Sequence, residues 1–185
     1  MTSTYSSGAY TDQKIATTDN GGGCTVSHTG TSAAAPLAAG ILALVLEARP
    51  DLTWRDVQHL VVYSSNPGPV INNPGWRKNG AGLSYNPRFG FGILDAETIV
   101  NMALVWRNVA EKTECVIAGT KQDLGADTRM RSRDLLTDND VVEIIFNSNI
   151  NNCGITSLEH VQAVVNIDHP VRGQLEILLI SPSGH

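Results

Sequence analysis

Residues 32–48 set the first constraint on the fold, because their pattern predicts a helix. Apolar side chains recur through the segment at helical spacing, namely Leu37, Ile41, Leu42, Val45 and Leu46. Pro36 is expected near the first turn, where its missing N–H costs little. Gly40 costs about 1 kcal/mol relative to alanine inside a helix. This cost predicts that Gly40 packs closely on a neighbouring element.

Two further helices are predicted before residue 111. In "RPDLTWRDVQHLVVYSSNPG", Thr53 is a candidate N-cap with Asp56 three residues later. The Asn-Pro-Gly sequence at 66–68 is expected to end that helix. A third helix is predicted over residues 96–106. Residues 1–31 are rich in Ser, Thr and Gly, and this composition predicts short strands joined by loops.

The sequence changes in character after Glu111. The runs "DVVEIIFN", "SLEHVQAVVNID" and "GQLEILLISP" are typical of β-strands, and the polar segment "GADTRMRSRDLLTDND" is typical of a loop. A chain of 185 residues can hold one large domain or two small ones. We therefore predict two domains, residues 1–110 and 111–185.

Composition excludes some classes of function. Hydrophobic residues make up 42% of the chain, which is enough for a core, and the net charge of −5 argues against electrostatic capture of nucleic acid. No apolar run is expected to reach the roughly 20 residues of a membrane-spanning helix. The first residues show neither a basic nor an apolar signal region. The chain is thus expected to be either cytosolic or a piece of a longer protein, and its odd number of cysteines, three, favours the second alternative.

Ser32, in "SHTGTSAAAPLAAG", is the candidate nucleophile. A serine hydroxyl needs a base to take its proton and donors for the developing oxyanion. A helix start supplies free N–H groups and the positive end of the helix dipole. The segment lacks the second glycine of the G-x-S-x-G motif. Spacing alone favours an ordinary helix cap for Ser32, so the nucleophile remains one of two alternatives at this point.

The sequence segments around Ser32 resemble those of the kexin/furin branch of the subtilisin-like serine proteases. The similar segments are "TYSSG", "HTGTSAAAPLAAG", "LTWRDVQHLVV", "NNPGWRKNGAGL" and "FGFGILDA". The later segments "SLEHVQAVVNI" and "RGQLEILLISPSG" resemble the P domain that follows the catalytic domain in that family. The resemblance implies the C-terminal part of an α/β subtilisin-like domain over residues 1–110. It also implies the N-terminal part of a mainly β, jelly-roll-like P domain over residues 111–185.

The same resemblance implies a function. Ser32 falls on the family's nucleophile. The whole protein is expected to be a calcium-dependent endopeptidase that cleaves precursor proteins and prohormones after paired basic residues. It is further expected to bind its own propeptide, and to be located in the secretory pathway (trans-Golgi or secretory granules) or to be secreted. Carboxylates that select Arg and Lys, and the main calcium ligands, lie before the serine segment in this family and are not recognisable here.

The resemblance also implies that the activating groups lie elsewhere. Subtilisin-like enzymes carry their triad in the order Asp, His, Ser, and both partners precede the serine by far more than 31 residues. His28, Thr29 and Thr31 are therefore expected to line the substrate cleft, and His28 is not expected to be the base. The backbone N–H of Ser32 is the one oxyanion donor that can be named. The alternative is a non-catalytic binding or scaffolding form that uses the P domain.

The remaining cysteines and histidines receive structural roles. By resemblance, Cys115 and Cys153 form the disulfide of the P domain and Cys24 has its partner upstream. Packing or a surface position is expected for His59 and His160, and His169 and His185 lie in or near turns. No two histidines have the spacing of metal ligands with a Cys or carboxylate helper, so no metal site is predicted.

Overall fold

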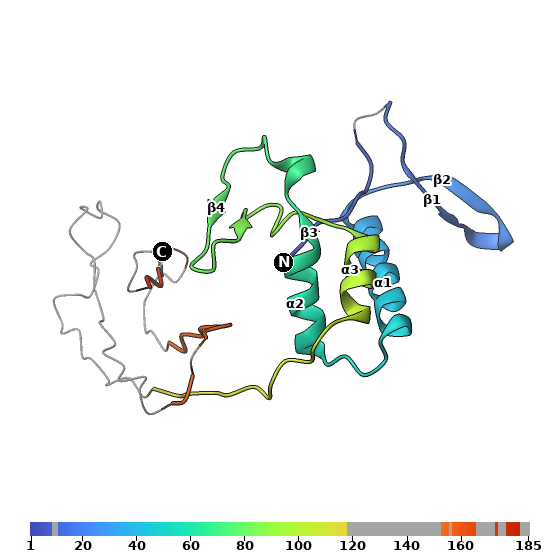
Figure 1. Ribbon diagram of the computed structural model, residues 1–185. Coiled ribbons are helices and arrows are strands. Elements are labelled where there is room, and N and C mark those ends of the chain that lie inside the picture. Colours follow the sequence, from blue (N-terminus) through green and yellow to red (C-terminus); the bar gives the residue numbers. More distant parts are fainter. Residues whose placement is uncertain (9–10, 118–152, 156, 166–172, 174–176, 182–185) are drawn as a thin grey trace, which may run out of the picture. The chain divides into compact units, whose positions relative to one another are not determined.

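The computed structural model describes residues 1–8, 11–117, 153–155, 157–165, 173 and 177–181 (Figure 1). The chain divides into two compact units, Met1–Ala110 and Glu111–His185. All helices and strands of the described residues lie in the first unit. Its elements are a mixture of helices and small sheets, as expected for a piece of an α/β domain.

The first unit is built around three helices, α1 (Thr31–Ala48), α2 (Trp54–Ser64) and α3 (Ala96–Leu104). Figure 1 shows them side by side, and α3 packs against both α1 and α2. One cluster of buried apolar side chains draws on all three helices and one strand: Val45, Leu60, Val61, Leu94, Ile99 and Ala103. This cluster holds the helices together and fixes the C-terminal half of α1.

The start of α2 confirms the predicted N-cap. The Thr53 hydroxyl accepts a hydrogen bond from the Asp56 N–H at 3.2 Å, and Asp56 Oδ2 accepts one from the Thr53 N–H at 2.8 Å. This reciprocal pair is a capping box. The third helix is shorter than predicted, since it begins after its cap Asp95 and ends at Leu104 rather than at residue 106.

Helix α1 corrects three expectations. It begins at Thr31 after Gly30, so Ser32 is its second residue and does not cap it. Pro36 lies five residues after Thr31, beyond the first turn, and it removes the N–H that would donate to the Ser32 carbonyl. Gly40 is exposed, and a Cβ there would meet nothing within 4 Å. The expected close packing at Gly40 is therefore wrong for the described part of the chain.

Where the chain is described, its strands form three antiparallel pairs. The first pair is β1 (Ile15–Thr18) with β2 (Cys24–His28), which the sequence predicted as strand pieces before the helix. The second is β3 (Ser65–Asn66) with β6 (Ile93–Leu94). The third is β4 (Arg77–Lys78) with β5 (Ser84–Tyr85). Figure 1 draws the β1–β2 hairpin away from the helices, and most of its residues are exposed.

The glycines of "FGFG" allow two backbones to approach each other. Gly92 has φ 125°, and a Cβ there would collide with the backbone of Asn66. A Cβ on Gly90, at φ 59°, would collide with the backbone of Met1. Only glycine fits such positions. The N-terminal segment can therefore lie beside β6, where Ser3 and Ile93 form a parallel bridge.

The second unit contains the expected disulfide. Cys115 and Cys153 are bonded, with their Cα atoms 5.6 Å apart, and Cys24 is a free, exposed cysteine. The run "DVVEIIFN" lies outside the described residues. The described parts of the other two predicted β runs have no strand partner among the described residues and expose large apolar side chains, such as Val164. A strand requires such a partner for its backbone hydrogen bonds.

Helix α1 is apolar along nearly its whole length. Its 18 residues have a mean hydropathy of 1.6, so by length and composition it could cross a membrane. The expectation that no apolar run reaches the length of a membrane-spanning helix is therefore wrong. The run is easily missed because alanine and glycine make up much of it and its one charged residue, Glu47, is near its end. The core helix of a soluble protein meets the same criterion.

The apolar side chains of α1 predict the behaviour of residues 1–185 in isolation. Leu37, Leu44 and Leu46 are 37%, 53% and 43% exposed, although a helix that is apolar all round is normally buried. Exposed apolar patches favour association and dye binding. We expect the isolated chain to bind a hydrophobic dye and to unfold without a cooperative thermal transition. A sharp transition without dye binding would show that α1 needs no further cover.

Candidate active site

Ser32 lies in the first turn of α1, on the connection that leaves β2. The first N–H groups of a helix have no partner one turn earlier and face outward from its start. They carry the positive end of the helix dipole. Ser32 is exposed, and its hydroxyl makes no hydrogen bond within the described residues. The three residues after it are the small Ala33, which is buried, Ala34, which is half-buried, and Ala35, which is exposed.

Gly30 makes the turn from β2 into α1. Its φ is 91°, in the left-handed region that other residues rarely adopt. Its carbonyl accepts a hydrogen bond from the Ala33 N–H at 3.0 Å, which closes a tight first turn around Ser32. No side chain caps the helix here. The glycine therefore gives Ser32 its place at the second position of α1.

The predicted cleft residues lie beside Ser32 on the same connection. His28 is the last residue of β2 and pairs with Ile15, Thr29 follows it, and Thr31 is the first residue of α1. All of them are exposed. No hydrogen bond joins His28 to Ser32 in the described structure. A cleft role for His28, Thr29 and Thr31 stays a prediction.

Sequence reasoning missed a second segment at this site. The Thr4 hydroxyl donates to the Ala34 carbonyl at 2.6 Å, and the Ser6 hydroxyl donates to the Gly30 carbonyl at 2.6 Å. The Ser7 and Thr29 hydroxyls are also hydrogen-bonded to each other. The available signal was the alternation of hydroxyl side chains in "TYSSG", because alternate residues of an extended segment share a face.

Asp56 is the fully buried carboxylate of the first unit. Burial alone would raise its pKa, but hydrogen bonds from Thr53, Val109 and Trp106 outweigh burial and lower the pKa of Asp56 to about 2. The donor distances are 2.6 Å for the Thr53 hydroxyl, 2.7 Å for the Val109 N–H and 3.0 Å for the Trp106 indole. Through the last two of these bonds the carboxylate fixes residues 106–109 to the start of α2. It is not available for proton transfer.

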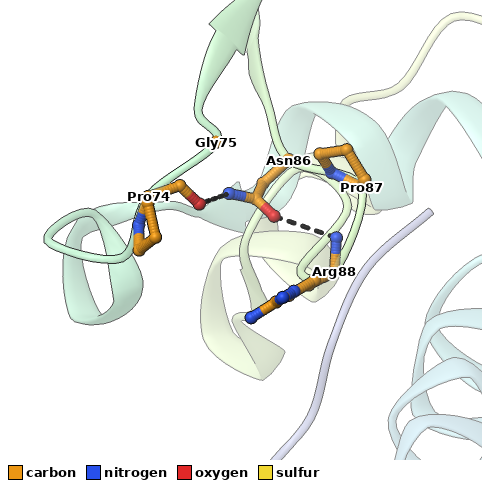
Figure 2. Close-up of a pocket in the computed structure, with 5 residues that line it drawn as sticks. All are labelled: Pro74, Gly75, Asn86, Pro87 and Arg88. Atoms are coloured by element: carbon orange, nitrogen blue, oxygen red, sulfur yellow. Dashed lines mark hydrogen bonds between the residues drawn. The ribbon is translucent and has the colours of Figure 1, made fainter.

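A pocket of about 270 Å³ lies on another part of the first unit. Figure 2 shows its lining residues: Pro74, Gly75, Asn86, Pro87 and Arg88. The Asn86 amide donates to the Pro74 carbonyl at 3.0 Å and accepts from the Arg88 N–H at 2.9 Å. These bonds join the lining residues of the pocket to one another. None of the lining residues belongs to the connection between β2 and α1 that carries Ser32.

Metal-ligating groups do not cluster where the chain is described. No group of three or more His, Cys, Asp or Glu side chains there could hold a metal ion. His59 stacks with Tyr63 and Trp106, with ring centroids 6.4 and 6.5 Å apart, and His160 is exposed. These positions agree with the packing and surface roles expected for them. His169 and His185 lie outside the described residues.

Similarity to known proteins extends along the whole chain. Residues 3–92 match the subtilase family, Peptidase S8, and residues 158–185 match the proprotein convertase P-domain. The chain is 42% identical over 188 residues to Endoprotease bli of Onchocerca volvulus, and 43% identical to proprotein convertase subtilisin/kexin type 4 of Homo sapiens over 190 residues. It is also 43% identical over 184 residues to furin of Mus musculus.

Each of these relatives is much longer than the chain. The matches cover 100% of this chain but 26%, 23% and 22% of the three relatives respectively. The chain therefore spans about a quarter of the length of these curated relatives. Among solved structures, the serine protease of Aeromonas sobria has a TM-score of 0.46 and 26% identity, covering 49% of this chain and 18% of that one.

Proposed function

Because the chain belongs to the proprotein convertases of the subtilisin-like protease family, we propose that the whole protein is a serine endopeptidase with Ser32 as its nucleophile. The observation that carries the proposal is the position of Ser32 in the first turn of α1, inside the segment that matches the subtilase family. We assign residues 1–110 to the peptidase domain and residues 111–185 to the P domain.

The proposed reaction is acyl transfer through Ser32. The Oγ atom attacks the carbonyl carbon of the scissile peptide, and its proton passes to a base supplied by a part of the protein outside residues 1–185. The backbone N–H of Ser32 donates to the developing oxyanion. The leaving amine takes a proton, and water then releases the acyl group. His28, Thr29 and Thr31 line the cleft in which the peptide binds.

The substrates that we propose are precursor proteins and prohormones, cut after paired basic residues. Several relatives, among them the type 4 enzyme of Homo sapiens, carry the name proprotein convertase, which supports the substrate class. A cleft lined with carboxylates would select Arg and Lys by charge and by bidentate hydrogen bonding. The protein's own propeptide is a further proposed partner. The same relatives support a location in the secretory pathway, within the trans-Golgi or secretory granules, or secretion from the cell.

Calcium dependence is proposed for the whole protein only. Calcium requires six to eight oxygen ligands, mainly from carboxylates, and no group of three or more His, Cys, Asp or Glu side chains among the described residues could hold a metal ion. The described residues therefore do not fit a calcium ion, and no step of the reaction is assigned to one.

Two peptides test the proposed specificity. The full-length protein should cleave a fluorogenic peptide ending in Arg-Arg at least about 10-fold faster than the matched Ala-Arg peptide, because a buried charge pair contributes more than about 1.4 kcal/mol. Cleavage should stop on addition of a calcium chelator and return with calcium. Equal rates for the two peptides would contradict dibasic specificity. An absence of cleavage in calcium would instead favour the non-catalytic, scaffolding alternative.

A further inference from the structure

The N-terminal segment touches the helix start on both sides of Ser32. Gly30 is two residues before Ser32 and Ala34 is two residues after it. The carbonyl of Gly30 accepts from the Ser6 hydroxyl, and that of Ala34 accepts from the Thr4 hydroxyl, both at 2.6 Å. These two bonds hold the backbone that carries the nucleophile from two directions.

Alternation along the segment explains how one short stretch makes both bonds. Thr4 and Ser6 are two residues apart, so in extended backbone their side chains point to the same face. Tyr5, between them, is 62% exposed on the other face. The Ser7 hydroxyl adds a bond to Thr29, just before the turn.

The segment is itself held by the core. The Ser3 N–H donates to the Gly92 carbonyl and the Leu94 N–H donates to the Ser3 carbonyl, each at 2.8 Å. Leu94 is buried in the hydrophobic cluster. The hydroxyls of Thr4 and Ser6 therefore start from a backbone that is fixed to β6.

The first turn of α1 is poorly held by its own bonds. Gly30 offers no side-chain cap, and Pro36 supplies no N–H to the Ser32 carbonyl. Bonds from outside the helix must then fix this turn more than is usual. A nucleophile displaced by about 1 Å can lose about 100-fold in rate, because attack needs a narrow range of geometry.

We propose that Thr4 and Ser6 are positioning residues for Ser32, which hold the first turn of α1 in the geometry for attack. This inference rests on the proposed function of Ser32. We expect these two hydroxyls to affect the chemical step more than the binding of the peptide, since each uses its one proton to hold the backbone of α1. Removing both hydroxyls should therefore lower kcat with little change in KM.

The test uses the full-length protein and the Arg-Arg peptide. The double variant Thr4→Val, Ser6→Ala should lose about 10- to 100-fold in kcat, with KM within about 2-fold. The rate of labelling by a fluorophosphonate should fall by the same factor. The conservative double variant Thr4→Ser, Ser6→Thr keeps both donors and should restore most of the rate. Ser3→Ala is the matched control, because the Ser3 hydroxyl lies 3.4 Å from the Phe89 carbonyl and does not reach α1.

Each outcome decides the inference. An unchanged kcat in the double variant, a rise in KM alone, or an equal loss in Ser3→Ala would overturn it, as would failure of the conservative variant to restore the rate. If the double variant does not accumulate, the single variant Ser6→Ala is measured instead. Its kcat should fall by about 5-fold while its KM stays nearly unchanged. Inactivity of the unmodified protein would overturn the proposed function itself, whereas an undiminished kcat in the double variant of an active protein would overturn this inference alone.

Discussion

Replacement of Ser32 by alanine in the full-length protein should lower the turnover of the Arg-Arg peptide by about 10⁶-fold, since loss of the nucleophile in a subtilisin-type triad has an effect of that size. Alanine fits the site, because Ser32 is followed by three alanines and its hydroxyl makes no hydrogen bond in the described structure. The thermal midpoint should stay within about 2 °C of the unmodified protein, as for most surface substitutions.

Ser27→Ala is the matched control for this loss. Ser27 lies on β2 and is also exposed, and its hydroxyl is 3.0 Å from that of Thr25. The control should keep the activity of the unmodified protein. A Ser32→Ala protein that retains more than about one-thousandth of the turnover would contradict the role of Ser32, because a triad without its nucleophile loses far more than this.

The second large effect is expected at Asp56. Asp56→Asn should lower the free energy of unfolding by about 2–4 kcal/mol, since the new amide must place an NH₂ group against buried donors. Asp95→Asn is the matched control. Asp95 also begins a helix, but its carboxylate serves the Thr98 N–H at 2.7 Å as an ordinary N-cap. Asn and Asp cap almost equally well, so the control should lose less than about 0.5 kcal/mol. Equal losses of unfolding free energy in the two variants would contradict the structural role of the Asp56 carboxylate.

The effect of Asp56 should depend on pH. Its pKa is about 2 in the folded protein, against an ordinary value of 3.8, so the unfolded chain binds the proton more readily. The carboxylate then contributes on the order of 2 kcal/mol above about pH 4, and this contribution is lost as the pH falls from about 4 to 2. The difference in unfolding free energy between the unmodified protein and Asp56→Asn should shrink by about 1 kcal/mol between pH 7 and pH 3. A difference that is constant over this range would contradict the lowered pKa.

Local sequence signals predicted the helices of the first unit well. The capping box at Thr53 and Asp56 was visible because both of its partners lie within one turn. The apolar repeat located α1, but the exact start depended on the backbone of Gly30, whose φ of 91° is not encoded in any periodicity. The same uncertainty in the start placed Pro36 too close to the first turn. The exposure of Gly40 depends instead on which elements cover α1, and no local pattern gives this.

Long-range bonds could not be predicted from spacing. Asp56 was recognised as a capping residue, yet its bonds to Trp106 and Val109 join residues 50 and 53 positions apart. The bonds from Thr4 and Ser6 to α1 depend in turn on the fixed course of the N-terminal segment beside β6. Ser32 was proposed as the nucleophile through the resemblance of the segments around it, because a serine near a helix start is by itself more typical of a cap.

The identity of the catalytic partners is the central point still to be measured. Among the convertases, the segments look most like a neuroendocrine convertase of type 1, although furin is close, and this assignment stays a prediction. The proposal places the Asp and His of the triad outside residues 1–185, in the larger part of the protein that the relatives contain. Without its base, a serine hydroxyl keeps little nucleophilicity.

Labelling with a fluorophosphonate, followed by mass spectrometry of the modified peptide, tests this claim most directly. The full-length protein should be labelled at Ser32, its Ser32→Ala variant should not be labelled, and residues 1–185 alone should also remain unlabelled. Labelling of the isolated chain at Ser32 that disappears in His28→Ala would contradict the account, because it would show that the base is the neighbouring histidine.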